Sequence, residues 1–202
     1  MIKTVIFDIG NVMVDFCFDQ FIARYGYSEE ILRRIRKATL ESGFWKELDR
    51  GIFSYEEVLL QFISKDPELE EQIRTLFSDT TGIVLKRDYA IPLVKRLRAA
   101  GYQVLALSNF PEKVYLENRE PLRFLDEMDG YILSYKDHVI KPDKEIYMLL
   151  MKRYGFLPEE CVFIDDLQEN LDTAKRLSWN TIRFEDYDQM VEALKQMNVI
   201  VG

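Results

Sequence analysis

Short hydrophobic runs recur along the chain and are separated by longer amphipathic segments. Four of the runs, at residues 5–7, 104–107, 131–133 and 162–164, are long enough for a buried strand and too short for a helix. A weaker run at residues 181–184 has the same character. The pattern therefore predicts five buried strands.

Helical patterns with recognisable ends lie between the later runs. Pro92 stands near the start of one pattern and Gly101 just after its end, and Pro142 stands near the start of another. Strands that alternate with helices are typical of parallel sheets whose strands are joined by helical crossovers. The predicted fold class is α/β, a doubly wound, Rossmann-like parallel sheet.

Residues 17–86 break this alternation because they carry helical patterns only. Ser54 and Glu57 have the spacing of a capping box, and Asp66 before Pro67 predicts an N-cap followed by a first-turn proline. The segment contains many aromatic residues, and we interpret them as the core of a small helical bundle.

The interruption divides the chain into an α/β core domain at residues 1–16 and 87–202 and an inserted helical cap domain at residues 17–86. The composition is that of folded domains, since 48% of the 202 residues are hydrophobic and 31% are charged. A formal net charge of −8 argues against nucleic acid as a partner, because nucleic-acid binding needs a basic surface. The basic cluster at residues 33–37 is interpreted as the solvated face of an amphipathic helix.

The cysteines and the lengths of the hydrophobic segments indicate in which cellular compartment the protein is expected. Cys17 and Cys161 lack the CxxC spacing of a zinc or redox site, so we expect them to pack in the interior. No signal peptide fits the N-terminus, and no hydrophobic run approaches the roughly 20 residues that span a bilayer. We therefore expect a cytoplasmic protein with no membrane partner. The sequence carries no signal for the oligomeric state.

Polar residues stand directly after three of the predicted strands, and a lysine follows another strand after a loop. Ligands of an open parallel sheet bind outside the carboxyl ends of its strands, so we expect these side chains to gather at one edge. In chain order they are Asp8, Ser108, Asn109, Lys141, Asp165 and Asp166.

This set has the chemistry of phosphoryl transfer. Carboxylates at the ends of two strands can hold Mg²⁺, which prefers oxygen ligands. The cation, Lys141 and the donors of Ser108 and Asn109 can share the negative charge of a phosphoryl group in the transition state. Asp8 is the candidate nucleophile. The residues thus predict Mg²⁺ as cofactor and a small-molecule phosphate ester as substrate.

The ordered motifs resemble those of the haloacid dehalogenase superfamily of hydrolases. Residues 7–12 resemble its first motif, residues 107–109 its second, residues 141–143 its third, and residues 163–166 with Asn170 its fourth. Any one of these motifs alone is weak evidence, whereas four in order at suitable spacing are strong evidence. The resemblance covers the whole of the predicted core domain.

The resemblance implies a role for each motif residue and for the cap. Asp8 would attack phosphorus, and Lys141 would restrain its charge. Closure of the cap would exclude water and select the substrate. The implied metal ligands are Asp8, the carbonyl oxygen of Gly10, Asp166 and, through a water molecule, Asp165. The implied phosphate-binding residues are Ser108, Asn109 and Lys141.

Gly10 departs from the family pattern. The family's phosphatases usually carry a second aspartate there, which protonates the leaving oxygen and then activates water, and such catalysis is worth ~10² to 10⁴ in rate. A sugar phosphorylated at its anomeric carbon needs less protonation, so Gly10 favours a sugar 1-phosphate. The motif around Gly10 is similar to that of the family's bacterial α-D-glucose-1-phosphate phosphatase branch, which shares the glycine.

Two other functions compete with the phosphatase. Metal-independent haloacid dehalogenases also lack the second aspartate, but that chemistry leaves the charges of Asp165 and Asp166 beside Asp8 without a role. A catalytically degenerate phospho-ligand or protein-binding module would use the pocket without turnover. The intact Asp8, Lys141 and Asp166 weigh against such a module, and Mg²⁺-dependent phosphate release discriminates between the alternatives.

Three further residues invite a role. His138 is the single histidine, and we expect it at a positive φ angle because the family usually has glycine at this place. Trp45 and Arg50 are polar-tipped members of the cap that could contact the leaving group. Their spacing alone does not orient them.

Overall fold

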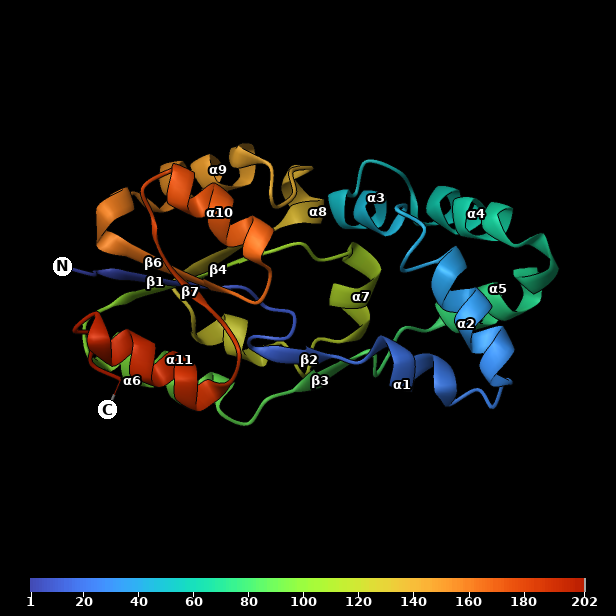
Figure 1. Ribbon diagram of the computed structural model, residues 1–202, viewed down its shortest axis with the longest axis horizontal. Helices are drawn as coiled ribbons and strands as arrows, with labels where there is room; N and C mark the ends of the chain where they lie inside the picture. Colours follow the sequence, from blue (N-terminus) through green and yellow to red (C-terminus); the bar gives the residue numbers. More distant parts are fainter. Residues whose placement is uncertain (202) are drawn as a thin grey trace.

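Five parallel strands form the central sheet within residues 1–201, the part of the chain that this computed structural model describes (Figure 1). Their order across the sheet is β5-β4-β1-β6-β7. Each strand coincides with one of the hydrophobic runs, so the five predicted strands are confirmed. Their bounds are Thr4–Phe7 for β1, Gln103–Ser108 for β4, Gly130–Leu133 for β5, Cys161–Asp165 for β6 and Asn180–Arg183 for β7.

Helices cover both faces of the sheet, with α6 and α11 on one face and α9 and α10 on the other (Figure 1). Side chains of a strand alternate between the faces. Val5 and Phe7 accordingly pack with α6 and α11, whereas Ile6 packs with α9 and α10. The predicted doubly wound α/β class is confirmed. The helices span Ala90–Ala99 (α6), Lys144–Tyr154 (α9), Gln168–Arg176 (α10) and Tyr187–Gln196 (α11).

Short helices occupy the remaining connections of the core. Over residues 1–201 no helix combines the length and hydrophobicity needed to cross a membrane. The short helices are α7 (Glu112–Glu117), η2 (Arg123–Glu127), α8 (Ser134–Asp137) and η3 (Pro158–Glu160).

A two-stranded antiparallel ribbon joins the core to the inserted helices. β2 (Val14–Phe16) pairs with β3 (Val84–Lys86), so the chain leaves the core and returns to it side by side. Asp15 of β2 forms an ion pair of 2.7 Å with Arg87, just beyond β3. The hydrophobic pattern did not predict this ribbon, because three residues are too few to show a strand periodicity.

The helices between β2 and β3 lie beside the carboxyl edge of the sheet, and we call α1 to α5 the cap (Figure 1). The predicted capping box is confirmed: the Glu57 carboxylate accepts from the Ser54 N–H at 2.8 Å, and Ser54 Oγ accepts from the Glu57 N–H at 3.3 Å. Aromatic rings form the centre of the cap, where Trp45 stacks on Phe62. The cap helices are α1 (Phe18–Ala23), α2 (Glu29–Ala38), α3 (Trp45–Arg50), α4 (Tyr55–Lys65), η1 (Pro67–Leu69) and α5 (Glu70–Ser78).

Asp66 is the N-cap residue of the helix that follows it, as predicted, but its side chain makes no capping hydrogen bond to that helix. Its two carboxylate oxygens accept hydrogen bonds from Arg34 of α2 at 2.6 and 2.7 Å. Pro67 still opens η1 as its first residue. A bidentate pair with a guanidinium is stronger than a bond from a neutral backbone N–H, so the distant arginine takes the carboxylate from the helix terminus.

Candidate active site

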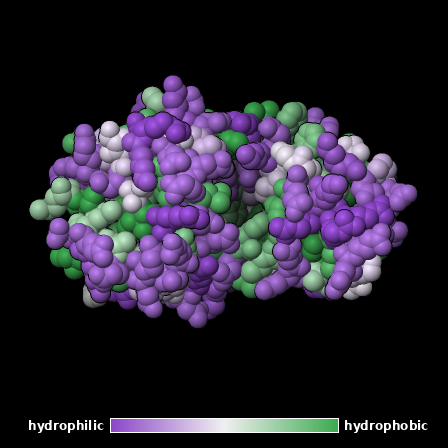
Figure 2. Space-filling view, viewed as in Figure 1, coloured by the Kyte–Doolittle hydropathy of each residue, from purple (hydrophilic) through white to green (hydrophobic). Residues whose placement is uncertain are grey.

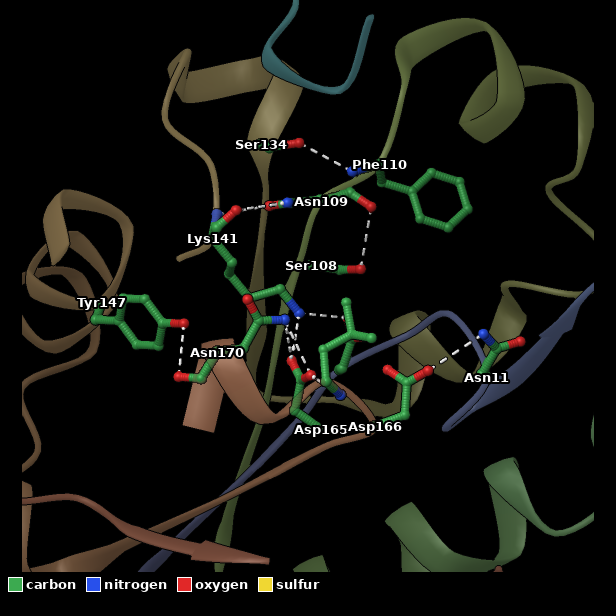
Figure 3. Close-up of polar contacts among 12 residues, drawn as sticks. Asn11, Ser108, Asn109, Phe110, Ser134, Lys141, Tyr147, Asp165, Asp166 and Asn170 are labelled. Atoms are coloured by element: carbon green, nitrogen blue, oxygen red, sulfur yellow. Dashed lines mark hydrogen bonds and ion pairs between the residues drawn. The ribbon is translucent and has the colours of Figure 1, made fainter. Parts of the chain in front are cut away.

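The carboxyl edge of the sheet brings the predicted site residues together (Figure 3). Asp8 follows β1, which lies between β4 and β6, and therefore stands between Ser108 at the end of β4 and Asp165 at the end of β6. Lys141 reaches the same place from the loop between α8 and α9. Asp8 and Lys141 are only 7% and 3% exposed, so the centre of the cluster is almost closed to solvent.

Lys141 is the positive charge at the centre of the cluster. Its Nζ lies 2.7 Å from Asp8 Oδ1 and 2.7 Å from Asp165 Oδ2. Burial alone would lower the pKa of the Lys141 ammonium, but the charges of Asp165 and Asp8 outweigh burial and raise it. Lys141 therefore stays protonated and holds one oxygen of Asp8, Oδ1.

Asp165 is fully buried, and protein donors occupy both of its oxygens. Oδ1 accepts from the Leu167 N–H at 2.8 Å, Oδ2 accepts from Lys141 Nζ at 2.7 Å, and Asn170 Nδ2 lies within 3.0 Å of each oxygen (Figure 3). These contacts hold the Lys141 ammonium in place. The water-mediated metal contact predicted for Asp165 stays a prediction.

Asn109 lines the cavity, and both polar ends of its side-chain amide contact the main chain of Lys141. Its Oδ1 accepts from the Lys141 N–H at 2.7 Å, and its Nδ2 donates to the Lys141 carbonyl at 2.9 Å (Figure 3). The side-chain amide therefore orients the lysine loop. Ser108 is 2% exposed and lines the cavity, where its hydroxyl can meet a phosphoryl group. The predicted phosphate contacts of both residues stay predictions.

Three carboxylates of the cluster have the arrangement of a cation site. Asp8, Asp165 and Asp166 each offer an oxygen, and these oxygens lie within 4.8 Å of one another. Burial raises the pKa of Asp8 to about 7, with Asp165 and Asp166 adding to the rise and Lys141 opposing it. Burial, together with the charge of Asp165, also raises the pKa of Asp166.

One ammonium does not balance these three carboxylates, and a divalent cation would relieve their repulsion. The donors are all oxygen atoms, as Mg²⁺ prefers. Asp166 is partly exposed, and Gly10 lines the same cavity, so both can face a cation from the open side. The residues therefore fit the predicted magnesium site.

Asn11 links the site to the ribbon that leads into the cap. Its φ angle is 56°, a left-handed conformation that asparagine tolerates. Its Nδ2 donates to Asp166 Oδ2 at 3.3 Å, and its Oδ1 accepts from the Phe16 N–H in β2. A movement of the ribbon would therefore shift Asn11 and, through it, the candidate metal ligand Asp166.

A cavity of about 320 Å³ opens above Asp8 between the core and the cap. Figure 2 shows a hollow between these two parts, with hydrophobic residues exposed inside it. The volume suits a small ligand. The cap contributes Leu40, Trp45, Lys46 and Asp49 to the lining, and the loop after β4 contributes Phe110.

Asp49 is a cavity residue that the sequence did not reveal. It is 8% exposed and, with Trp45 and Leu48, forms the buried face of α3. The spacing of these three residues, i, i+3 and i+4, is the signature of one helix face and could have identified it. Of the two cap residues considered from sequence, Trp45 lines the cavity and Arg50 forms an ion pair of 3.4 Å with Asp143 of the core.

His138 lies outside the cavity lining and has a φ angle of 58°, which confirms its predicted positive-φ conformation. Its Nδ1 is 3.2 Å from the carbonyl oxygen of Arg50. The histidine therefore contributes to the contact between the core and the cap.

Comparisons with known proteins agree with the fold and the motifs. Residues 2–177 match the family model of the haloacid dehalogenase-like hydrolases. The D-ribitol-5-phosphate phosphatase of Bacteroides thetaiotaomicron is 27% identical over 92% of this chain and 93% of its own length. Acyl-CoA dehydrogenase family member 10 of Mus musculus is 26% identical over 99% of this chain, which spans only 19% of that protein.

A solved structure supports the same fold. A HAD family enzyme from Bacteroides thetaiotaomicron, in complex with magnesium and inorganic phosphate, superposes with a TM-score of 0.69 over 94% of this chain and 99% of its own. Its sequence identity is 20%, so this likeness concerns the fold alone.

Proposed function

The chain belongs to the haloacid dehalogenase-like hydrolases, and we propose that it is a magnesium-dependent phosphatase that acts on a small phosphate ester through a phosphoryl intermediate on Asp8. One observation carries the proposal: Asp8 lies at the base of the cavity, within ion-pair distance of Lys141 and beside Asp166. A nucleophile, a fixed cation and a metal ligand thus face one small-molecule cavity.

Asp8 has two oxygens with different surroundings. Oδ1 is paired with Lys141, which leaves the second oxygen to attack phosphorus in line with the leaving oxygen. The new bond joins this oxygen to phosphorus as the ester P–O bond breaks, and the departing oxygen takes a proton. Water then attacks the phosphoryl group on Asp8, which releases inorganic phosphate and restores the carboxylate.

Lys141 and the magnesium site would divide the charge of the reaction. Asp8, Asp166 and the carbonyl oxygen of Gly10 would hold Mg²⁺, which when bound would neutralise charge on the phosphoryl oxygens. Lys141, held by Asp165, would stabilise the same oxygens from the protein side. The predicted core of residues 1–16 and 87–202 would supply this chemistry, and the cap of residues 17–86 would select the leaving group.

Sugar 1-phosphates are the substrate class that we propose first. Gly10 supplies no proton donor, and an anomeric oxygen needs less protonation on leaving than an ordinary alkoxide. The relative named D-ribitol-5-phosphate phosphatase supports an ester of similar size, and the cavity of about 320 Å³ has room for one.

Two observations favour the phosphatase over its alternatives. A metal-independent dehalogenase would keep Asp8, Asp165 and Asp166 together without a divalent cation to relieve their repulsion. A degenerate phospho-ligand module would not need Asp8, whose negative charge repels a phosphate, yet Asp8 lies intact beside both Lys141 and Asp166.

A screen of phosphorylated metabolites tests the proposal. Purified protein is incubated with each ester with and without Mg²⁺, and released phosphate is measured, with glucose 1-phosphate and glucose 6-phosphate compared directly. We expect Mg²⁺-dependent release and a higher kcat/KM for the 1-phosphate. Binding without release from any ester would refute the enzyme, whereas a strong preference for the 6-phosphate would refute only the leaving-group argument from Gly10.

A further inference from the structure

Asp49 lines the cavity with a buried carboxyl group, and the proposed reaction gives this group no role. It comes from the cap, whereas the other reacting groups come from the core, and it lines the same cavity as Asp8. No residue within 1–201 donates a hydrogen bond to its carboxyl group or forms an ion pair with it. Its carboxyl oxygens are not among the fully buried, unpartnered side-chain atoms of residues 1–201, so they open onto the cavity, where a ligand can meet them.

Contacts on the neighbouring main chain hold Asp49 over the cavity. The Ser134 hydroxyl donates to the Asp49 carbonyl oxygen at 2.5 Å. Gly51, the C-cap of α3, has a φ angle of 68°. It lies so close to the core that an added Cβ would be 2.8 Å from the main-chain carbonyl oxygen of Tyr135. Arg50, between them, pairs with Asp143 at 3.4 Å. The end of α3 is therefore seated on the core while the Asp49 side chain faces the cavity.

The other carboxyl groups of the cavity are either committed or exposed. Asp8 is the proposed nucleophile, and Asp166 is the proposed metal ligand. Glu169 is exposed at the rim. Among the cavity-lining carboxyl groups, Asp49 is thus the one that is buried and has no assigned task.

The surroundings of Asp49 favour its protonated form. Burial raises its pKa to about 8, with Lys141 opposing the rise, Asp8 adding to it and Lys46 opposing it. Lys46 lies on the same helix and is exposed, whereas Asp8 and Lys141 face Asp49 from the core. A neutral carboxylic acid near pH 7 can donate a proton, as an ordinary aspartate cannot.

We propose that Asp49 supplies from the cap the proton transfer that Gly10 cannot supply from the core. The inference rests on the proposed phosphatase function. In the first step the Asp49 carboxyl donates its proton to the leaving oxygen as the ester P–O bond breaks, which yields a neutral alcohol. In the second step the Asp49 carboxylate takes a proton from the water that attacks the phosphoryl group on Asp8, and both residues return to their starting states.

A donor on the cap has a consequence for substrate choice. The donor reaches the leaving oxygen only when the cap lies against the core, as it does here through Ser134. Esters whose alkoxide leaves poorly then remain substrates, so the preference for 1-phosphates expected from Gly10 should be smaller in the wild type than in Asp49→Asn. The cap decides both which leaving group fits and whether it is protonated.

A matched pair of substrates tests the role of Asp49. Phenyl phosphate and 4-nitrophenyl phosphate have nearly the same shape, but the nitro group stabilises the departing oxygen so that it needs little protonation. We expect Asp49→Asn to lower kcat/KM for phenyl phosphate by ~10² or more and for 4-nitrophenyl phosphate by less than about tenfold. Glucose 6-phosphate and glucose 1-phosphate provide a second pair, with the greater loss expected for the 6-phosphate.

The second step has its own readout. Asp49→Asn should release a burst of 4-nitrophenolate equal to the enzyme concentration, followed by slow turnover, because water lacks its base. The burst also counts folded active sites. Glu30→Gln, an exposed carboxylate of cap helix α2 outside the cavity lining, is the control and should leave both substrates unaffected.

The outcomes separate this inference from the proposed function. An equal loss for both esters of a pair, or no loss for either, would overturn the assignment of Asp49 while leaving the phosphatase in place. A wild-type protein that releases no phosphate with Mg²⁺ from any ester would overturn the phosphatase itself. A loss of kcat/KM in Asp49→Asn that is greater for the poorer leaving group, together with a burst of 4-nitrophenolate, supports both the role of Asp49 and the phosphatase function.

Discussion

The Ser134 hydroxyl donates a 2.5 Å hydrogen bond to the main-chain oxygen of Asp49, and so joins the core to the cap at the edge of the cavity. Ser134 Oγ also accepts from the Phe110 N–H at 2.9 Å (Figure 3). Phe110 follows the two residues predicted to bind phosphate. One fully buried hydroxyl therefore positions helix α3 of the cap and the loop after β4 relative to each other.

Ser134→Ala should destabilise the protein and slow its reaction. The change leaves the Phe110 N–H and the Asp49 carbonyl without their partner, which costs about 1 to 3 kcal/mol of unfolding free energy. Urea unfolding measures the loss, and kcat/KM for phenyl phosphate should fall more than that for 4-nitrophenyl phosphate. Ser64→Ala, at an exposed position of α4, should change stability by no more than about 0.5 kcal/mol. If Ser134→Ala had the stability and the kcat/KM values of the wild type, the contact would not position the cap.

Asp8→Asn should abolish turnover without loss of the fold. The amide keeps the shape of the side chain but cannot form the phosphoryl intermediate. In the absence of metal the variant should be at least as stable as the wild type, because one of three crowded carboxylates is removed. Thermal unfolding and phosphate release measure the two effects, with the exposed Asp172→Asn as control. Activity in Asp8→Asn protein shown by mass to be free of deamidation would refute the covalent mechanism.

Magnesium should stabilise the folded protein through Asp166. A ligand that binds only the folded state adds ~2.7 kcal/mol at 100 times its Kd. The melting temperature of the wild type should therefore rise with MgCl₂ and return to its original value with a chelator, and the rise should be smaller in Asp166→Asn. Glu169→Gln removes a neighbouring exposed carboxylate and should keep the full rise. An equal rise in wild type and Asp166→Asn would remove Asp166 from the metal site.

Gly10→Asp should restore proton transfer to the Asp49→Asn variant. An added Cβ at Gly10 meets nothing within 4 Å, so a side chain fits there. The double variant should recover kcat/KM for phenyl phosphate relative to Asp49→Asn alone, because a carboxyl group again lines the cavity. Gly10→Asn in the same background has nearly the same size but no acidic proton, and should recover nothing. If Gly10→Asp and Gly10→Asn restored kcat/KM equally, the recovery would come from packing and not from proton transfer.

The pH dependence should distinguish the two aryl esters. Only the protonated Asp49 can donate, and burial raises its pKa to about 8. The kcat/KM for phenyl phosphate should therefore fall as pH rises through about 8, and this limb should vanish in Asp49→Asn. Asp8, Lys141 and Lys46 also face this group, so the same limb in Asp49→Asn would assign the titration to one of them.

The sequence by itself determined the sheet and the edge at which the chemistry lies. Hydrophobic runs such as residues 104–107 are local signals of buried strands, and parallel strands must present their carboxyl ends at one edge. Those two facts predict that Asp8, Ser108 and Asp165 share one edge, whereas the strand order that places Asp8 between the other two was seen only in the structure. The capping box of Ser54 and Glu57 was equally predictable, because both partners lie within one helical turn.

Only the tertiary structure decided which partner each polar side chain contacts. Asp66 pairs with Arg34 rather than with its own helix, and Asn109 contacts the lysine loop 32 residues away. Asp49 faces the cavity because α3 ends against Ser134, 85 residues further along the chain. Periodicity places a residue on a face of its own element, but which other element packs on that face depends on contacts distant in sequence. The proposed nucleophile could therefore be identified from the sequence, whereas the proposed proton donor could be identified only in the fold.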